Sequence, residues 1–289
     1  MVLKVATRGS KLALKQTDIA IAYLKKYLKD IDFEIVIIKT HGDKDITSAL
    51  YNMQTNGVFV KDVEEALVCH QADIAVHSLK DVSSTLHEGL MLLPHLIFEN
   101  KQDCLITKNK QKLKDIKANG IIATSSIRRM ACIHHLRPDI SFVNMRGNID
   151  TRINKFMNSD YDGMILAGAG LQRLGLDNYI SEYLDPSLVI PACGQGTIAL
   201  DIRKEDLQLY QALFDIHDIR QKEVDIEREF LKYSNASCHE PVGCYVKIND
   251  KINIYAMKGT NIDDSIFVHE VFDLDEKDII PKLLRKFEL

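Results

Sequence analysis

The stretch ADIAVHSLKD, residues 72–81, carries the pattern that decides the fold of this chain. Its first six residues are apolar enough for a buried strand, and polar and charged residues follow at once. The elements that apolar spacing predicts before it are a strand over residues 2–7, a helix over 11–28, a strand over 33–39 and a helix over 58–70. The resulting βαβαβ unit is typical of an α/β domain with a largely parallel sheet.

The same order of elements recurs after Asn100. The predicted elements are a strand over residues 121–124, a helix over 128–136, a strand over 141–145, a helix over 151–157 and a strand over 163–167. Farther on, a charged helix over residues 218–233 precedes alternating strands with a turn at Asn249-Asp250, and a last helix over 276–287 contains Pro281, which favours a kink or a late start. We therefore expect two similar α/β lobes, residues 1–97 with 196–215 and residues 98–195, followed by a small α+β domain over 216–289.

The composition argues against several classes of partner. The net charge of −4 gives no global positive field for nucleic acid or an anionic membrane, so we expect neither partner. No apolar run suits a membrane span, and none near Met1 suits a secretory signal, so we expect a cytoplasmic protein. The six cysteines form no C-x-x-C pair, which favours free thiols.

Cations gather where the predicted strands end. The strand ends and the residues just after them supply Arg8, Lys80, Arg128, Arg129, Arg146, Arg152 and Arg173. From Ser125 to Arg173 the chain has seven Arg and Lys against four Asp, although it is negative as a whole. Ligands of open α/β sheets bind at these strand ends, and the arginine fork suits carboxylate or phosphate. The set therefore predicts a site for a polyanionic ligand.

Each of these residues also has an ordinary structural interpretation. Any single arginine can be solvated or paired with a nearby acid. The hydroxyls of Ser10, Thr124, Ser125 and Ser126 can cap helices as readily as they can bind a ligand. Asp81, the one acid among these cations, can form a structural ion pair, or it can stabilise a substrate cation or transfer a proton.

The cysteines divide by their surroundings. Cys69, Cys104 and Cys132 lie in apolar helical or strand-like patterns and are predicted to be core residues. Cys193 and Cys238 lie in loops, and the neighbouring His239 makes Cys238 the better candidate nucleophile. A zinc site through Cys238, His239 and Cys244 fits no common ligand spacing, so we expect no metal.

Seven motifs in order carry a resemblance to a known family. They are ATRGSKLAL-x-Q, VHSLKD, TSSIRR, MRGNIDTR, AGLQRLG, PACGQG and CHEPVG, and they span nearly the whole chain up to Gly243. Together they resemble the porphobilinogen deaminase (hydroxymethylbilane synthase) family. The resemblance implies two similar periplasmic-binding-protein-like α/β lobes plus a small C-terminal α+β domain.

The resemblance also implies roles for particular residues. Cys238 of CHEPVG would carry a covalent dipyrromethane cofactor, made from the enzyme's own substrate, and Asp81 would be the catalytic aspartate. The implied cofactor-binding residues are Lys80, Thr124, Ser126, Arg128, Arg129 and Arg146, and the implied substrate-binding residues are Arg8, Ser10, Gln16, Arg146, Arg152 and Arg173. The chain departs from the family pattern at Asn56, where lysine is usual, and at Ser83 and Cys193.

The implied activity belongs to heme and porphyrin (tetrapyrrole) biosynthesis. A transferase of this family joins four porphobilinogen units head to tail, with loss of ammonia, into hydroxymethylbilane. Asp81 would assist ammonia loss and stabilise the azafulvene cation that results. We further expect a monomer whose product passes to uroporphyrinogen-III synthase. Two other functions fit the residues less well: a two-lobed, non-catalytic anion-binding protein, and a nucleic-acid binder that uses the arginines.

Overall fold

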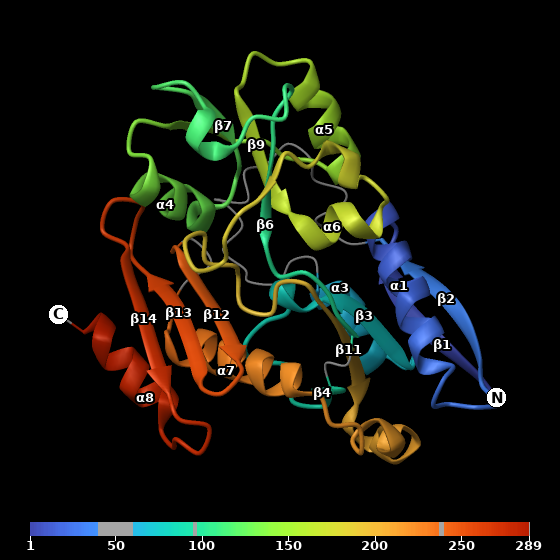
Figure 1. The fold of residues 1–289 in the computed structure, drawn as a ribbon. Helices are drawn as coiled ribbons and strands as arrows, with labels where there is room; N and C mark the ends of the chain where they lie inside the picture. The colour runs from blue at the N-terminus through green and yellow to red at the C-terminus, as the bar shows by residue number, and fades with distance from the viewer. Residues whose placement is uncertain (40–59, 95–96, 237–239, 289) are drawn as a thin grey trace. The chain divides into compact units, whose positions relative to one another are not determined.

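The computed structural model describes residues 1–39, 60–94, 97–236 and 240–288, and the chain forms two compact units. Unit 1 contains Met1–Glu99 and Thr197–Gln221, whereas unit 2 contains Asn100–Gly196 and Lys222–Leu289. Figure 1 colours both along the chain. The predicted α/β class is confirmed, because each unit has its own mixed sheet with helices packed on it. No helix within the described ranges is long and apolar enough to cross a membrane.

The sheet of unit 1 begins with the predicted parallel strands. Strands β1 (Val2–Arg8), β2 (Asp32–Ile38) and β3 (Ile74–Ser78) run parallel in the order β2-β1-β3. The next strand, β11 (Thr197–Arg203), was not predicted; it lies antiparallel between β3 and β4 (Leu90–Leu92) and also pairs with β5 (Ile97–Phe98). All seven residues of β11 are buried, so the chain returns from unit 2 to complete this sheet.

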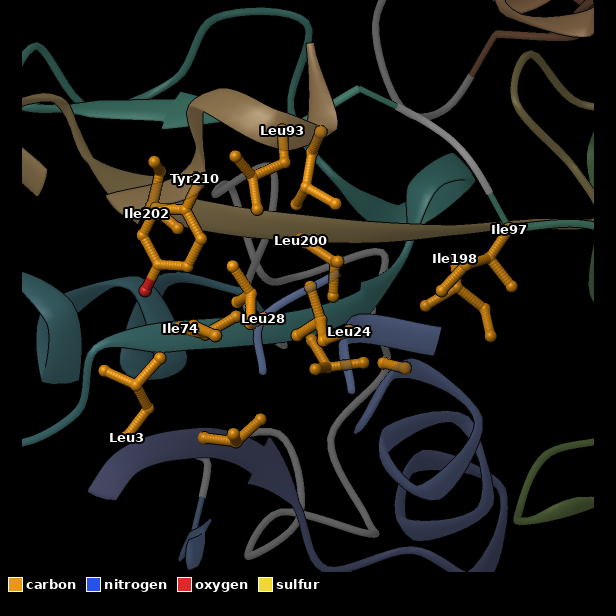
Figure 2. Close-up of a cluster of buried hydrophobic side chains, with 14 residues drawn as sticks. Leu3, Leu24, Leu28, Ile74, Leu93, Ile97, Ile198, Leu200, Ile202 and Tyr210 are labelled. Carbon is orange, nitrogen blue, oxygen red and sulfur yellow. The ribbon is translucent and has the colours of Figure 1, made fainter. Parts of the chain in front are cut away.

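The first helix of unit 1 begins at a polar cap. Helix α1 (Lys11–Leu24) starts at Ser10, whose hydroxyl accepts a hydrogen bond from the backbone N–H of Ala13, and ends before the predicted residue 28. Helix α3 (Lys61–Val68) leads into β3, followed by the 3₁₀ helix η2 (Leu79–Asp81); η5 (Lys204–Leu213) follows β11. Leu24, Ile74 and Leu200 meet in a core that Tyr210 also enters (Figure 2).

Cys69 is a correction to the sequence prediction. We expected its thiol in the core, but Cys69 is exposed and caps the C-terminus of α3. Its sulfur contacts the Glu65 carboxylate at 3.3 Å, on the solvent side of the helix. The helical pattern ends at Val68, so the apolar spacing that placed Cys69 inside no longer applies there.

Unit 2 has a similar α/β arrangement, but different strands complete one edge of its sheet. Its sheet has the order β10-β6-β9-β7-β8, in which β7 (Ile121–Ala123), β8 (Ser141–Val143) and β9 (Gly163–Ala167) are parallel. Strand β6 (Asp103–Ile106) runs antiparallel to β9, and β10 (Glu182–Tyr183) pairs with β6. The remaining elements are α4 (Ile127–Leu136), α5 (Ile149–Met157), α6 (Gly168–Arg173), η3 (Leu113–Asp115) and η4 (Asp177–Tyr179).

A second sheet of unit 2 is the predicted antiparallel meander. Strands β12 (Val242–Ile248), β13 (Ile252–Lys258) and β14 (Ile266–Phe272) pair in order, and Asn249-Asp250 lies in the first turn as predicted. Helices α7 (Ile219–Tyr233) and α8 (Ile279–Leu284) bury Phe230 and Leu283 against it, and η6 (Arg285–Phe287) follows. Pro281 is the third residue of α8, which therefore starts late rather than kinking.

Phe156 provides a test of the packing in unit 2. Its ring is fully buried with Ala123 and Leu166, whereas the next residue of α5, Met157, is 44% exposed. Phe156→Ala should lower the free energy of unfolding by about 3–5 kcal/mol, because it removes buried apolar surface and leaves a cavity. Urea denaturation measures this, and Met157→Ala is the matched control with a change of less than about 1 kcal/mol. Equal effects of the two substitutions would contradict the packing described.

Candidate functional site

Asp81 is held at the end of β3 by its buried neighbours. Leu79 and Val82, on either side of Lys80-Asp81, are 0% and 2% exposed, and the backbone N–H of Val82 donates to the Leu79 carbonyl at 3.0 Å. The Asp81 side chain itself is exposed and Lys80 is half-buried. The short 3₁₀ helix η2 therefore presents the Asp81 carboxylate to solvent from a rigid base.

The start of α1 lies beside this strand end. The amide Nε2 of Gln16, a buried residue, donates to the hydroxyl of Ser78 at 2.8 Å. Ser10 caps the same helix, so the capping interpretation of Ser10 is confirmed. Its hydroxyl hydrogen stays available for a second partner, because the cap uses only the oxygen as an acceptor. Sequence positions 10, 16 and 78 thus belong to one corner of unit 1.

His77 is a titratable group that the sequence interpretation left unassigned. It lies in β3, fully buried, with its Nε2 3.4 Å from Oδ2 of Asp201 on the neighbouring strand β11. Loss of hydration, with a smaller contribution from the positive charge of Arg8, lowers the pKa of His77 to about 4. The imidazole is therefore neutral at physiological pH, four residues before Asp81.

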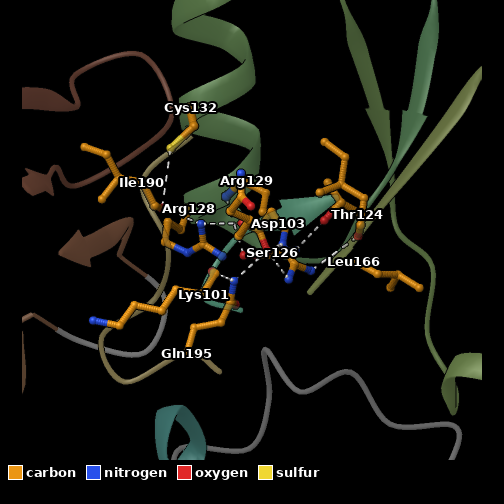
Figure 3. A network of polar contacts seen from close by, with 12 residues as sticks. Lys101, Asp103, Thr124, Ser126, Arg128, Arg129, Cys132, Leu166, Ile190 and Gln195 are labelled. Carbon is orange, nitrogen blue, oxygen red and sulfur yellow. Dashed lines mark hydrogen bonds and ion pairs between the residues drawn. The ribbon is translucent and has the colours of Figure 1, made fainter. Parts of the chain in front are cut away.

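In unit 2, Arg128 and Arg129 converge on a single buried carboxylate (Figure 3). Oδ2 of Asp103 accepts from Nη1 of Arg128 at 2.8 Å, and Oδ1 accepts from Nε and Nη2 of Arg129 at 3.0 and 2.7 Å. Burial alone would raise the pKa of Asp103, but the charges and hydrogen bonds of the two arginines lower it well below its usual range. The Asp103 carboxyl is therefore ionised at neutral pH.

Of the hydroxyls around this pair, only that of Ser126 has the helix-capping role that the sequence left open. Ser126 caps α4 by accepting from the backbone N–H of Arg129 at 3.5 Å. Thr124 accepts from the N–H of Ser126 at 3.3 Å, and the hydroxyl of Ser125 is 3.0 Å from both the N–H and the carbonyl of Met145. These contacts fix the turn between β7 and α4.

Arg146, Arg152 and Arg173 lie in the segments that follow neighbouring strands of unit 2. Arg146 is exposed after β8, and its carbonyl accepts from Lys155 at 3.2 Å. Nε of Arg152 donates to the carbonyl of Gly147 at 2.6 Å, at a position where φ is 121° and glycine is favoured. Arg173 is buried, and its Nη2 donates to the carbonyl of Gly196 at 2.8 Å.

Cys238 and Asn56 lie outside the described residues, whereas residues 240–243, the end of the CHEPVG segment, lie within them. The N–H of Cys244 donates to the carbonyl of Pro191 at 3.1 Å. A Cβ added to Gly243 would lie 2.8 Å from that carbonyl oxygen and 3.0 Å from Cδ of Arg128. The end of the CHEPVG segment therefore packs directly against Arg128.

The remaining cysteines of unit 2 are core residues. Cys104, Cys132, Cys193 and Cys244 are buried, as predicted for Cys104 and Cys132, and burial raises the pKa of each thiol. Within the described residues, no three His, Cys, Asp or Glu side chains are grouped so as to hold a metal ion.

Comparison with known proteins shows the family to which a chain with these features belongs. The family model "Porphobilinogen deaminase, dipyromethane cofactor binding domain" matches residues 3–211, which include Asp81, Asp103 and all the arginines described above. The chain belongs to the porphobilinogen deaminase family. The family predicted from the seven motifs is thereby confirmed, and the matched domain is one that binds dipyrromethane.

Individual relatives are similar in sequence to this chain over most of their length. Porphobilinogen deaminase of Staphylococcus carnosus is 43% identical over 250 residues, which cover 86% of this chain and 81% of that protein. Porphobilinogen deaminase of Lachnospira eligens is 40% identical, with 95% of each chain covered. Among solved structures, the probable amino-acid ABC transporter extracellular-binding protein YtmK of Bacillus subtilis is 10% identical with a TM-score of 0.45, covering 78% of this chain and 95% of that one.

The pH dependence of stability tests the environment of His77. Its imidazole is protonated below about pH 6.5 in the unfolded chain but stays neutral down to about pH 4 in the folded one. Unfolding therefore takes up a proton between these values, and the free energy of unfolding falls as the pH decreases through this window.

Between pH 7 and pH 5 the His77 contribution to this loss is about 2 kcal/mol. We therefore expect the free energy of unfolding of His77→Gln, measured by urea denaturation, to fall by about 2 kcal/mol less than that of the wild type between pH 7 and pH 5. His70→Asn is the control, because His70 is exposed and its φ of 53° suits asparagine. A His77→Gln protein with the wild-type pH slope would show that burial does not keep this ring neutral.

Proposed function

We propose that this chain is a transferase that joins four porphobilinogen units head to tail, with loss of ammonia, into hydroxymethylbilane. The observation that carries the proposal is the family match over residues 3–211, because the matched region contains both the Asp81 carboxylate and the strand-end arginines. Each porphobilinogen unit has an acetate and a propionate. A growing oligopyrrole is therefore the polyanion that these cations suit.

Asp81 is proposed as the catalytic carboxylate. In its protonated form it donates a proton to the leaving amine, so the C–N bond of the aminomethyl group breaks and ammonia departs with the electron pair. The resulting carboxylate stabilises the azafulvene cation by on the order of 4 kcal/mol at ~4 Å and an effective dielectric of about 20, before desolvation. After the new carbon–carbon bond forms, Asp81 takes up the proton released from the attacked ring. The exposed position of Asp81 on η2 supports this assignment.

The dipyrromethane is proposed to be joined by a thioether to Cys238, and when bound it supplies a pyrrole ring with a free α-carbon to which the first unit is added. The contact of Gly243 with Arg128 supports this attachment, because it ties the segment after Cys238 to a carboxylate-binding side chain. The residues proposed to bind its carboxylates are Lys80, Thr124, Ser126, Arg128, Arg129 and Arg146. The hydroxyls of Thr124 and Ser126 accept backbone hydrogen bonds and keep a hydrogen to donate.

The substrate chain is proposed to be held by a partly overlapping set, Arg8, Ser10, Gln16, Arg146, Arg152 and Arg173. We also propose that the protein is a cytoplasmic monomer, that uroporphyrinogen-III synthase takes up its product, and that residues 216–289 act as a domain that carries the cofactor cysteine. The antiparallel sheet β12–β14 with α7 and α8 supports the last point.

Asp81→Asn should lower kcat by about 10²–10⁴-fold, because the amide can neither donate the proton nor balance the cation. Steady-state formation of hydroxymethylbilane measures this. Asp115→Asn is the matched control: Asp115 ends the tripeptide Leu-Lys-Asp of η3, the same sequence in the same 3₁₀ conformation as η2. Turnover of Asp81→Asn near the wild-type rate would contradict the assignment.

The intact mass of the denatured protein tests the tether. Freshly purified wild type should exceed the mass of the bare polypeptide by two pyrrole units, since a thioether survives denaturation. Cys238→Ser should lack this addition, whereas Cys69→Ser, which removes an exposed thiol elsewhere, should keep it. A wild-type mass equal to that of the bare chain in active enzyme would overturn the covalent attachment.

A further inference from the structure

The buried arginine pair has more charge than its carboxylate can balance. Arg128, Arg129 and Asp103 are 5%, 7% and 0% exposed, so two positive charges share one negative charge away from water. Within the part of the chain that the structure describes, neither guanidinium has a second carboxylate within 4.0 Å. A largely desolvated charge without a counter-charge is unfavourable, so the site favours an anion from outside the protein.

The donor atoms show which arginine keeps a whole edge for that anion. Arg129 has no unused edge, since Nε and Nη2 donate to Asp103 and Nη1 donates to the carbonyl of Ile165 at 3.3 Å, which leaves one N–H on each Nη. Arg128 uses only Nη1, which donates to Asp103 and to the carbonyl of Ile190 at 2.5 Å. Its Nε and Nη2 have no acceptor among the described residues. This edge of the guanidinium is one that binds a carboxylate through two parallel hydrogen bonds.

Asp103 is itself held in place by a chain of contacts. Nε2 of Gln195 donates to Oδ1 of Asp103 at 3.0 Å and to the carbonyl of Lys101 at 2.7 Å. The ammonium of Lys101 pairs with Glu223 and Glu227 at 3.2 and 2.8 Å, and Glu227 also accepts from the N–H of Gly194 at 2.9 Å. The carboxylate of Asp103 therefore has a fixed position that is independent of any ligand.

We propose that Asp103 is a positioning residue for carboxylate binding: it clamps Nη1 of Arg128 so that the Nε–Nη2 edge receives a carboxylate of the bound pyrrole chain. Asp103 also offsets one of the two buried positive charges, which leaves a single charge for the ligand to match. The inference rests on the proposed function for the identity of the ligand. It assigns a role to an acidic residue that does not itself contact the anion.

A double-mutant cycle with Asp103→Asn and Arg128→Lys tests the proposal. Lysine keeps a positive charge beside Asp103 but removes the forked edge. Cofactor-free protein is incubated with increasing porphobilinogen, and the intact mass of the denatured chain gives the concentration that loads half of it. Each single variant should raise this concentration about tenfold or more, because each disrupts the same pair of hydrogen bonds from Arg128 to the ligand carboxylate. The double variant should be no worse than the weaker-binding single variant, since Asp103 acts through Arg128.

Controls separate positioning from general loss of structure. Asp139→Asn removes the partner of Arg137, an ion pair of 2.7 Å near the solvent-exposed end of α4, and should leave loading unchanged. Thermal unfolding without porphobilinogen reports the stability of each variant. If Asp103→Asn gives no cooperative unfolding, Asp103→Glu replaces it, because it keeps the charge but shifts the oxygens by one methylene, and the same rise is expected.

The outcomes distinguish this inference from the function on which it rests. A wild-type chain that never gains two pyrrole units overturns the proposed function and the inference with it. Normal loading of the wild type together with normal loading of Asp103→Asn, or of Asp103→Glu if that variant is the one that folds, overturns the inference alone. Independent effects that multiply in the double variant also overturn it.

Discussion

The ion pair of Asp103 with Arg128 and Arg129 is the interaction on which the rest of unit 2 depends. It joins strand β6, which supplies the acid, to helix α4, which supplies both bases, and it reaches the loop before β11 through Gln195. Burying three charges is unfavourable unless nearly every donor and acceptor is satisfied, and removing one partner of such a group typically costs 3–5 kcal/mol. The proposed binding of a carboxylate and the structural integrity of unit 2 therefore depend on the same few atoms.

The sequence predicted the parts of the fold that depend on local periodicity. Strands β1, β2 and β3, helices α1, α4 and α5, and the turn at Asn249-Asp250 follow from apolar spacing and turn residues, and each is present. Strand β11 was missed because its seven buried residues include Thr197, Asp201 and Arg203, so neither alternation nor an unbroken apolar run marks it. Its partners lie far back in the sequence, and no short window contains them.

The candidate site likewise divides into features that the local sequence predicts and features that depend on tertiary contacts. Charge placement identified the cations at the strand ends, but it could not show which of them are exposed: Arg146 is exposed, whereas Arg128 and Arg173 are buried. Asp103 was missed although a lone acid opening an apolar strand, DCLI, is a usable signal that a buried cation lies opposite. Pairing such an acid with its bases requires the tertiary contact between β6 and α4, which spacing alone does not give.

The late return of the chain to unit 1 bears on the order of folding. Strand β11 lies in the interior of the first sheet, yet it is translated only after the whole of Asn100–Gly196. The first 99 residues therefore leave the ribosome with the edge of β3 unpaired and part of their apolar face uncovered. Exposed strand edges and apolar surface favour aggregation in nascent chains. During translation, every residue of the first sheet of unit 2, β6 to β10, is therefore synthesised before β11, the last strand of the unit 1 sheet.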